Sequence, residues 1–180
     1  MVTDIPGLED PQRRILTATV GGIRLINLYV PNGTEPASDK FQYKLNWLDK
    51  VTHFIQQQMS LYSKVAVLGD FNIAPEDRDV HDPIEWDGCV LVSPPERHAF
   101  ATLLSLGLYD SFRSFPQEEK LFSWWDYRAA GFRQNRGLRI DHVLLSHELN
   151  RLCQQSAIDK EPRKAARPSD HAPVWVELDL

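Results

Sequence analysis

An apolar run turns into a carboxylate within the stretch Lys64-Val-Ala-Val-Leu-Gly-Asp-Phe-Asn72. Apolar runs of this length are typical of strands that are buried on both faces of a sheet. The strand leads to Asp70, and the end of a strand is where a rigid element can present a polar group to a cleft. Because side chains alternate along a strand, Asp70 and Asn72 can point the same way. A simple turn with Asn72 as a cap is the alternative.

The flanking sequence predicts alternating strands and helices. Two β-rich runs meet at Gly21 and Gly22, which is a good hairpin signal. Ser93 and Glu96 form a capping box at the start of a helix. The expected strands are 15–20, 23–30, 64–68, 140–145, 155–159 and 174–178, and the expected helices are 41–59, 94–106 and 146–152. This alternation predicts mixed α and β layers, and 180 residues suit one compact domain over residues 1–180.

Bulk composition argues against several classes of protein. The net charge of -5 disfavours a surface that is basic throughout. No apolar run approaches the roughly 20 residues of a membrane span, so we expect a soluble, cytoplasmic protein that does not bind membranes. Cys89 and Cys153 lack C-x-x-C spacing, which predicts reduced packing residues and excludes a zinc ribbon.

Polar groups recur where the predicted strands begin or end. They are Tyr29, Asp70 with Asn72, Asp141, and Asp170 with His171. Each has a simple structural explanation alone, as a turn or as the edge of the core, but their joint occurrence favours a common site. Crowded carboxylates raise one another's pKa values unless a cation compensates. Asp and Asn oxygens are the ligands that Mg²⁺ prefers, and no His or Cys cluster has zinc spacing, so a hard divalent cation is expected.

A basic and aromatic segment lies at residues 122–139. Within it, residues 128–139 hold four arginines and no acidic residue, which suits contact with a phosphate backbone. Aromatic rings nearby can stack on an exposed sugar or base. The arginines are Arg128, Arg133, Arg136 and Arg139, and the rings are Trp124, Trp125, Tyr127 and Phe132. Phe122 is expected in the core, and Trp125 stays open between the two roles.

Five motifs follow one another along the chain. They are Tyr29-x-Pro-Asn-Gly, Gly69-Asp-Phe-Asn-Ile-Ala-Pro75, Phe122-Ser-Trp-Trp-Asp-Tyr-Arg128, Asn135-Arg-Gly-Leu-Arg-Ile-Asp141 and Pro168-Ser-Asp-His-Ala-Pro-Val174. In this order and spacing they resemble the exodeoxyribonuclease III family of the exonuclease, endonuclease and phosphatase superfamily. The resemblance extends over essentially the whole chain. It implies a four-layer α/β/β/α sandwich and hydrolysis of DNA phosphodiesters with Mg²⁺ or Mn²⁺. It further implies a monomer that incises duplex DNA at abasic sites and removes nucleotides from 3′ ends.

The resemblance assigns a role to each catalytic candidate. Asp70 would activate the attacking water or protonate the leaving oxygen, and Asn72 would orient it and contact the phosphate. Tyr29 would bond the scissile phosphate or tune the metal-bound water. His171 would stabilise the pentacovalent phosphorane, and Asp141 would hold His171 in its working tautomer, a recurrent catalytic unit.

The same motifs imply metal ligands and DNA contacts. The implied metal ligands are Asp70, Asn72 and Asp170. In the family the tryptophan of the Phe-Ser-Trp motif lines the pocket for the abasic sugar, which points to Trp124. The implied DNA-binding residues are Trp124, Tyr127, Arg128, Arg133, Arg136 and Arg139.

The front of the chain departs from the family pattern. The family carries two further motifs ahead of the matched region, an early strand that ends in an Asn and a Gln-Glu pair whose Glu is a principal metal ligand. Residues 1–28 match a mid-domain hairpin instead, and Glu9 lies in a turn-like stretch that makes it a poor substitute. We therefore expect the fold to lack its first strands and helix, with an open sheet edge, lowered stability and weak metal binding.

Three functions fit these observations. The first is a metal-dependent DNA repair nuclease whose 180-residue piece is weak or inactive. The second is a non-catalytic DNA-binding remnant, which the missing Glu favours. The third is a superfamily phosphatase that acts on inositol or sphingolipid phosphates. The segments Trp-Trp-Asp-Tyr-Arg and Asn-Arg-Gly-Leu-Arg disfavour the third, since a phosphatase of that kind should lack them.

Overall fold

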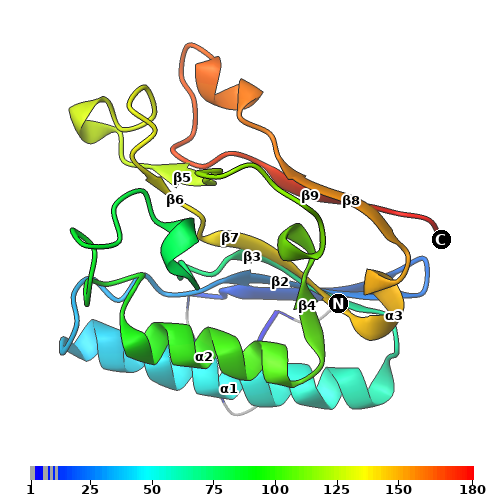
Figure 1. The fold of residues 1–180 in the computed structure, drawn as a ribbon. Coiled ribbons are helices and arrows are strands. Elements are labelled where there is room, and N and C mark those ends of the chain that lie inside the picture. The colour runs from blue at the N-terminus through cyan, green and yellow to red at the C-terminus, as the bar shows by residue number, and fades with distance from the viewer. Residues whose placement is uncertain (1–2, 6–7, 9, 11) are drawn as a thin grey trace.

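A five-stranded mixed sheet forms the centre of the molecule, which the computed structural model describes for residues 3–5, 8, 10 and 12–180 (Figure 1). Its strands, in spatial order, are β1 (Ile15–Val20), β2 (Ile23–Tyr29), β3 (Val65–Asp70), β7 (Asp141–Ser146) and β4 (Leu108–Asp110). Two separate strand pairs are β5 (Trp124–Trp125) with β6 (Gly137–Leu138), and β8 (Cys153–Ile158) with β9 (Val174–Leu178). The α-helices are α1 (Asp39–Leu61), α2 (Pro94–Ser105) and α3 (His147–Asn150), and the 3-10 helices are η1 (Asp77–Asp79), η2 (Ser111–Ser114), η3 (Arg128–Ala130) and η4 (Glu161–Lys164). Glu9, which the sequence makes a poor substitute for the metal-ligand Glu of the family, lies outside the described residues.

The central strand β3 is buried on both faces, as its sequence predicts. Val65 and Val67 pack in the core beneath the helices, whereas Ala66 and Leu68 belong to the core on the opposite face. β3 runs parallel to β2 and antiparallel to β7. The strand runs to Asp70, so the predicted carboxylate at its end is confirmed.

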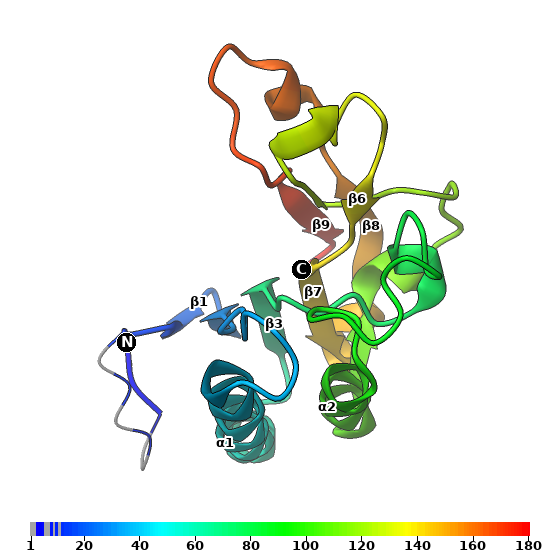
Figure 2. The ribbon, with the colours of Figure 1, turned by 90° about the vertical axis from the view of Figure 1, so that its left-hand side faces the viewer.

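Helices α1 and α2 lie side by side along one face of the sheet (Figures 1 and 2). The apolar stripe that predicts α1 is buried at Phe41, Leu48, Val51 and Ile55. The predicted capping box at the start of α2 is present as well. Both long helices therefore begin and end within two residues of their expected positions.

The strand pair β8–β9 covers part of the opposite face of the sheet. Val174 and Val176 of β9 pack against a small core that includes Ala66 and Val143. In the part of the chain that the structure describes, no further strand extends this pair, and α1 and α2 lie on the other side of the sheet. The mixed α/β class is confirmed. The three layers are the helices α1 and α2, the five-stranded sheet and the β8–β9 pair. The complete four-layer sandwich stays a prediction.

Two further expectations have mixed outcomes. Gly21 and Gly22 connect β1 to β2 with φ values of 55° and 81°, which confirms the hairpin. Both cysteines are free thiols, but only Cys153 is buried, so the expectation that Cys89 is a packing residue is wrong.

Among the described residues, no helix combines the length and the apolar character needed to cross a bilayer.

Gly69 permits the close approach of β2 and β3 beside Asp70. Its φ is 128°, and a Cβ added there would lie 2.1 Å from the carbonyl oxygen of Leu28. A side chain at this position would push the two strands apart where Leu28 pairs with Gly69, one residue before the Tyr29–Asp70 pair. Glycine is therefore required here by both space and backbone conformation.

We expect Gly69→Ala to lower the free energy of unfolding by roughly 2–4 kcal/mol, because it adds overpacking to backbone strain. The matched control is Gly21→Ala, where φ is 55° and nothing lies within 4 Å of the added Cβ. That control should cost only about 1–2 kcal/mol. Urea unfolding followed by tryptophan fluorescence measures both, and equal losses would contradict this account of Gly69.

Candidate active site

Three adjoining strands bring the first side chains of the site to one level of the sheet. The β2–β3 register pairs Tyr29 with Asp70, and the β3–β7 register pairs Asp70 with Asp141. Neighbouring strands lie about 4.8 Å apart, so these residues are close neighbours. The structure therefore brings together three residues that are far apart in the sequence.

His171 reaches the same level from the loop that precedes β9. Its Nδ1 lies 2.9 Å and 3.1 Å from the two carboxylate oxygens of Asp141. Ser123 anchors both partners. Its carbonyl accepts the Ala172 N–H at 2.7 Å, and its hydroxyl oxygen accepts the Asp141 N–H at 3.0 Å. Sequence reasoning gave Ser123 no role, although it lies within the Phe-Ser-Trp motif.

Asn72 bonds the Asp70 carboxylate twice. Its backbone N–H donates to one oxygen of Asp70 at 2.8 Å, and its side-chain amide donates to the other at 3.0 Å. The Asn72 side-chain oxygen accepts a hydrogen bond from the amide of Asn32 at 3.1 Å. Asn72 has a φ of 49°, a left-handed conformation that Asn tolerates. The turn that we considered as an alternative is thus present, and it holds the carboxylate.

The charges of the site perturb its titration. Burial raises the pKa of Asp70 to about 6, with the negative charge of Asp141 adding to the effect. Burial alone would lower the pKa of His171, but the hydrogen bond and the charge of Asp141, followed by the charges of Asp70 and Asp170, leave that pKa above its ordinary value. Three carboxylates therefore act on one imidazole.

The predicted metal ligands fit a hard cation by their chemistry but supply only part of a coordination shell. Asp70, Asn72 and Asp170 offer oxygen donors, and a bound cation would favour the anionic form of Asp70, which burial and then the charge of Asp141 disfavour. One oxygen of Asp170 already accepts the indole N–H of Trp124 at 3.0 Å. Within the described residues, no group of three or more His, Cys, Asp or Glu side chains is arranged to hold a metal ion.

The aromatic residues of segment 122–132 divide between core and surface. Phe122 and Trp125 are fully buried, which confirms Phe122 as core and settles Trp125. Phe132 packs edge-on against Trp125 with ring centroids 5.0 Å apart, and Arg163 lies over both rings. Trp125 is therefore not available to stack on DNA as we had considered. Tyr127 is 62% exposed and remains a candidate for such contacts.

Arg139 is not placed to bind DNA, and this prediction is wrong. Its side chain is 1% exposed and donates hydrogen bonds to Asp79 at 2.6 Å and to Asp110 at 2.8 Å. Both carboxylates come from distant parts of the sequence, so the acid-free window around Arg139 did not reveal them. Burial without these partners would be too costly for a guanidinium.

The other three arginines are exposed, and two of them line a pocket next to Trp124. This pocket has a volume of about 150 Å³, and Trp124, Arg128 and Arg136 are part of its wall. Arg128 pairs with Asp126, and Arg136 lies 3.3 Å from Glu85, so part of their charge is already neutralised. Arg133 remains exposed without lining the pocket.

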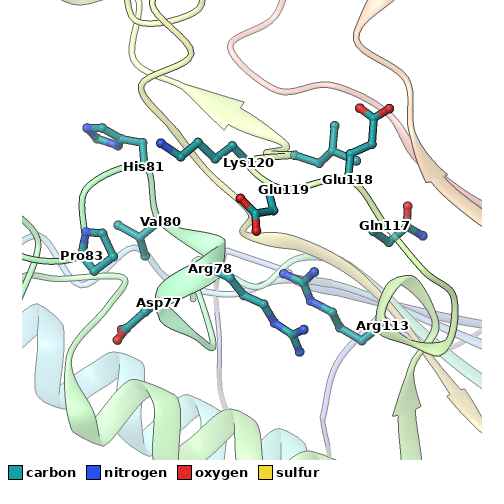
Figure 3. Close-up of a pocket in the computed structure, with 11 residues that line it drawn as sticks. Asp77, Arg78, Val80, His81, Pro83, Arg113, Gln117, Glu118, Glu119 and Lys120 are labelled. Carbon is teal, nitrogen blue, oxygen red and sulfur yellow. The ribbon is translucent and has the colours of Figure 1, made fainter.

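A larger pocket of about 560 Å³ lies elsewhere, between η1 and residues 117–121 (Figure 3). None of the predicted site residues lines it. Its wall mixes charges of both signs, including Arg78, Lys120 and Glu119. We place the site at the level of Asp70 instead, because the hydrogen-bonded His171–Asp141 pair and the perturbed pKa values lie there.

Comparison with known proteins identifies the family. A sequence model of the Endonuclease/Exonuclease/phosphatase family matches residues 2–171. The chain belongs to this family. It is 36% identical over 182 residues to exodeoxyribonuclease III of Haemophilus influenzae, and the match covers 94% of this chain and 68% of that protein. The resemblance seen in the sequence is therefore confirmed, and the chain falls among the exodeoxyribonuclease III-like phosphodiesterases.

Two solved structures of the exonuclease III and AP endonuclease branch of this family share the fold. The 3′ phosphatase NExo from Neisseria, bound to product DNA hairpin, superposes with a TM-score of 0.97 at 44% identity, over 99% of this chain and 70% of that chain. An AP endonuclease from Archaeoglobus fulgidus gives a TM-score of 0.90 at 34% identity, over 97% of this chain and 69% of that chain. The chain thus spans about 70% of the length of either structure.

His142 lies behind the site in an entirely buried position. Its Nε2 hydrogen-bonds the Ile73 carbonyl at 2.9 Å, and its Nδ1 accepts a bond from Arg139 at 3.0 Å. Burial, followed by the charge of Arg139, lowers the pKa of His142 to about 4. The folded protein therefore holds this imidazole neutral, while the unfolded chain takes up a proton near pH 6.5.

We expect His142 to reduce stability as the pH falls from about 6.5 to about 4, because only the unfolded chain binds the proton in that window. The difference in the free energy of unfolding between wild type and His142→Gln should change by at most about 1.4 kcal/mol for each pH unit. Comparing variants removes the opposite contribution of Asp70, whose raised pKa favours the folded state on acidification. A pH-independent difference would contradict the neutral, buried imidazole.

Proposed function

We propose that this chain hydrolyses phosphate esters of DNA, as a repair nuclease that acts on duplex DNA at abasic sites and 3′ ends. The observation that carries this proposal is the His171–Asp141 pair beside Asp70 at one level of the sheet. Family membership supports the reaction class, since exodeoxyribonuclease III-like enzymes are phosphodiesterases. We take residues 1–180 to act as one monomeric domain.

Asp70 would act as the general base on the attacking water, or as the acid that protonates the leaving oxygen. A carboxyl group with a pKa of about 6 can exchange protons near neutral pH. Asn72 holds the carboxylate by two hydrogen bonds and would orient the attacking group. Tyr29 shares this level of the sheet and is 54% exposed, so its hydroxyl would reach the scissile phosphate.

His171 would stabilise the negative charge of the pentacovalent phosphorane. Asp141 takes up Nδ1, which leaves Nε2 for a phosphoryl oxygen. The raised pKa of His171 favours the cationic imidazole that such a role requires. Asp141 would thus act by orienting and charging His171.

Asp70, Asn72 and Asp170 would hold Mg²⁺ or Mn²⁺, and the bound ion would neutralise charge on the phosphate. The family is typically metal-dependent. These residues supply only two carboxylates and one amide oxygen, so we propose that the chain binds metal weakly and turns over slowly.

Trp124, Tyr127 and the exposed arginines Arg128, Arg133 and Arg136 would contact the DNA. The exposure of Tyr127 and of the three arginines supports their assignment, and the pocket that Trp124 lines supports that of Trp124. The Neisseria relative is named a 3′ phosphatase and is bound to product DNA hairpin, and the Archaeoglobus relative is named an AP endonuclease. We therefore expect a 3′-terminal phosphate and an abasic site to be the two substrates to assay first.

The direct test uses the purified chain with labelled duplexes that carry an abasic site, a recessed 3′ end or a 3′-phosphate. Slow cleavage that requires Mg²⁺ or Mn²⁺ and stops with EDTA would support the proposal. Binding to abasic DNA in EDTA without cleavage in either metal would favour the alternative, a non-catalytic DNA-binding remnant. Release of phosphate from inositol phosphates alone would contradict both.

Asp70→Asn should slow cleavage strongly while stabilising the fold. We expect turnover to fall by about 10³-fold, since the proton-transfer group is lost. Above pH 6 the free energy of unfolding should rise by about 1 kcal/mol, because the variant no longer buries a charge next to Asp141. Gel-based cleavage and urea unfolding measure the two effects, and unchanged turnover would remove Asp70 from the mechanism.

A further inference from the structure

The side chain of Lys44 is completely buried beneath the site. It extends from α1, and its ammonium group donates to the carbonyl of Asn72 at 2.7 Å and to the carbonyl of Asn32 at 3.0 Å. It also forms an ion pair with Glu96, whose side chain is equally buried. An ammonium group has three N–H donors, so these partners use all of them.

Glu96 is itself held in place by the start of α2. Its carboxylate accepts the backbone N–H groups of Leu91 at 3.0 Å and Ser93 at 3.1 Å, and it completes the capping box of the helix. The ion pair therefore joins α1 to α2 and to the segment that precedes α2. Buried ion pairs are poor sources of stability compared with apolar packing, so this one calls for another explanation.

The two carbonyls that Lys44 holds belong to the residues that support the Asp70 carboxylate. The side chains of Asn32 and Asn72 bond each other at 3.1 Å, and Asn72 bonds Asp70 through both its backbone and its side chain. Asn72 also has the left-handed conformation, with a φ of 49°. A rigid contact at its carbonyl is a means of keeping that conformation.

We propose that Lys44, anchored by Glu96, is a positioning residue that fixes Asn72 and thereby the carboxylate of Asp70. This inference rests on the proposed function, since it concerns the same site. Lys44 touches no substrate, because its side chain is fully buried and its three donors are occupied within the protein. It acts through the asparagine pair.

The opposite end of α1 offers a matched control. There Arg24, also buried, donates to Gln58 of α1 at 2.8 Å and joins the helix to the start of β2. Arg24 pairs with Val65, five residues before Asp70 along β3, so it lies about 17 Å from the site. Arg24→Met should lower stability without disturbing Asn72.

The test variant is the double substitution Lys44→Met and Glu96→Gln, which removes both buried charges together and leaves neither unpaired. Amide hydrogen exchange of Asn72 is measured by NMR relative to the amide of Val67 in the middle of β3, which corrects for global unfolding. We expect the Asn72 amide to exchange about tenfold faster in the double variant and to change less than about twofold in Arg24→Met. An unchanged Asn72 rate in the double variant would overturn the proposal.

If the double variant does not fold, Ser93→Ala replaces it. That variant keeps both buried charges and removes only the Ser93 hydroxyl that donates to the Glu96 carboxylate, so the anchor of Lys44 is weakened and the Asn72 amide should exchange about threefold faster. The same rate as in wild type would again overturn the proposal.

Steady-state cleavage of the abasic duplex separates this inference from the proposed function. In the double variant we expect kcat to fall about tenfold with KM within about twofold, because the carboxylate is misplaced while the DNA contacts remain. If the wild type turns over and the double variant has the same kcat, the positioning role is overturned. Absence of turnover in the wild type would reject the proposed function, and the exchange rates would still decide the role of Lys44.

Discussion

The register of β3 between β2 and β7 is the constraint on which the rest of the molecule depends. It places Asp70 between Tyr29 and Asp141 at the point where the buried part of the sheet ends. A slip of one residue would send the side chain of Asp70 to the opposite face. The apolar residues Val65 and Val67 on one face and Ala66 on the other hold the register, so core packing and site geometry share one cause.

Burial of that carboxylate creates the chemistry of the site. Burial and the negative charge of Asp141 disfavour the anionic form of Asp70. The positive charge of His171 and the hydrogen bond from the Asn72 N–H favour that form. A divalent cation, free or bound to a phosphate, would stabilise the anionic carboxylate of Asp70. The site is thus strained electrostatically in the folded chain, as expected where function competes with stability.

Much of this arrangement was predictable from the sequence because the signals are local. The run that ends at Asp70, the capping box at Glu96 and the motifs around Asp141 and His171 each lie within a few residues. The prediction for Arg139 is wrong because its partners Asp79 and Asp110 lie 60 and 29 residues away in the sequence. No local sequence pattern predicts a buried ion pair between residues so far apart. Tertiary contacts alone decide whether an arginine faces solvent or core.

Lys44 was missed for a related reason, although one signal was present. It follows Phe41 by three residues and precedes Leu48 by four, so it falls on the buried stripe of α1. A lysine on an apolar stripe indicates a buried partner, but the partner itself, Glu96, lies 52 residues away. The four-layer architecture implied by the family resemblance is likewise beyond local evidence, and it stays a prediction beside the five-stranded sheet and the two strand pairs of the described residues.

The central claim is that the end of β3 holds a buried carboxylate crowded by a second one. Titration of the Asp70 side-chain carboxyl by carbon-detected NMR, in metal-free buffer, tests this most directly. The account predicts a pKa of about 6 for Asp70, well above the ordinary value of 3.8. An Asp70 that titrates near 3.8 would show a solvated, uncrowded carboxylate and would contradict the site as described.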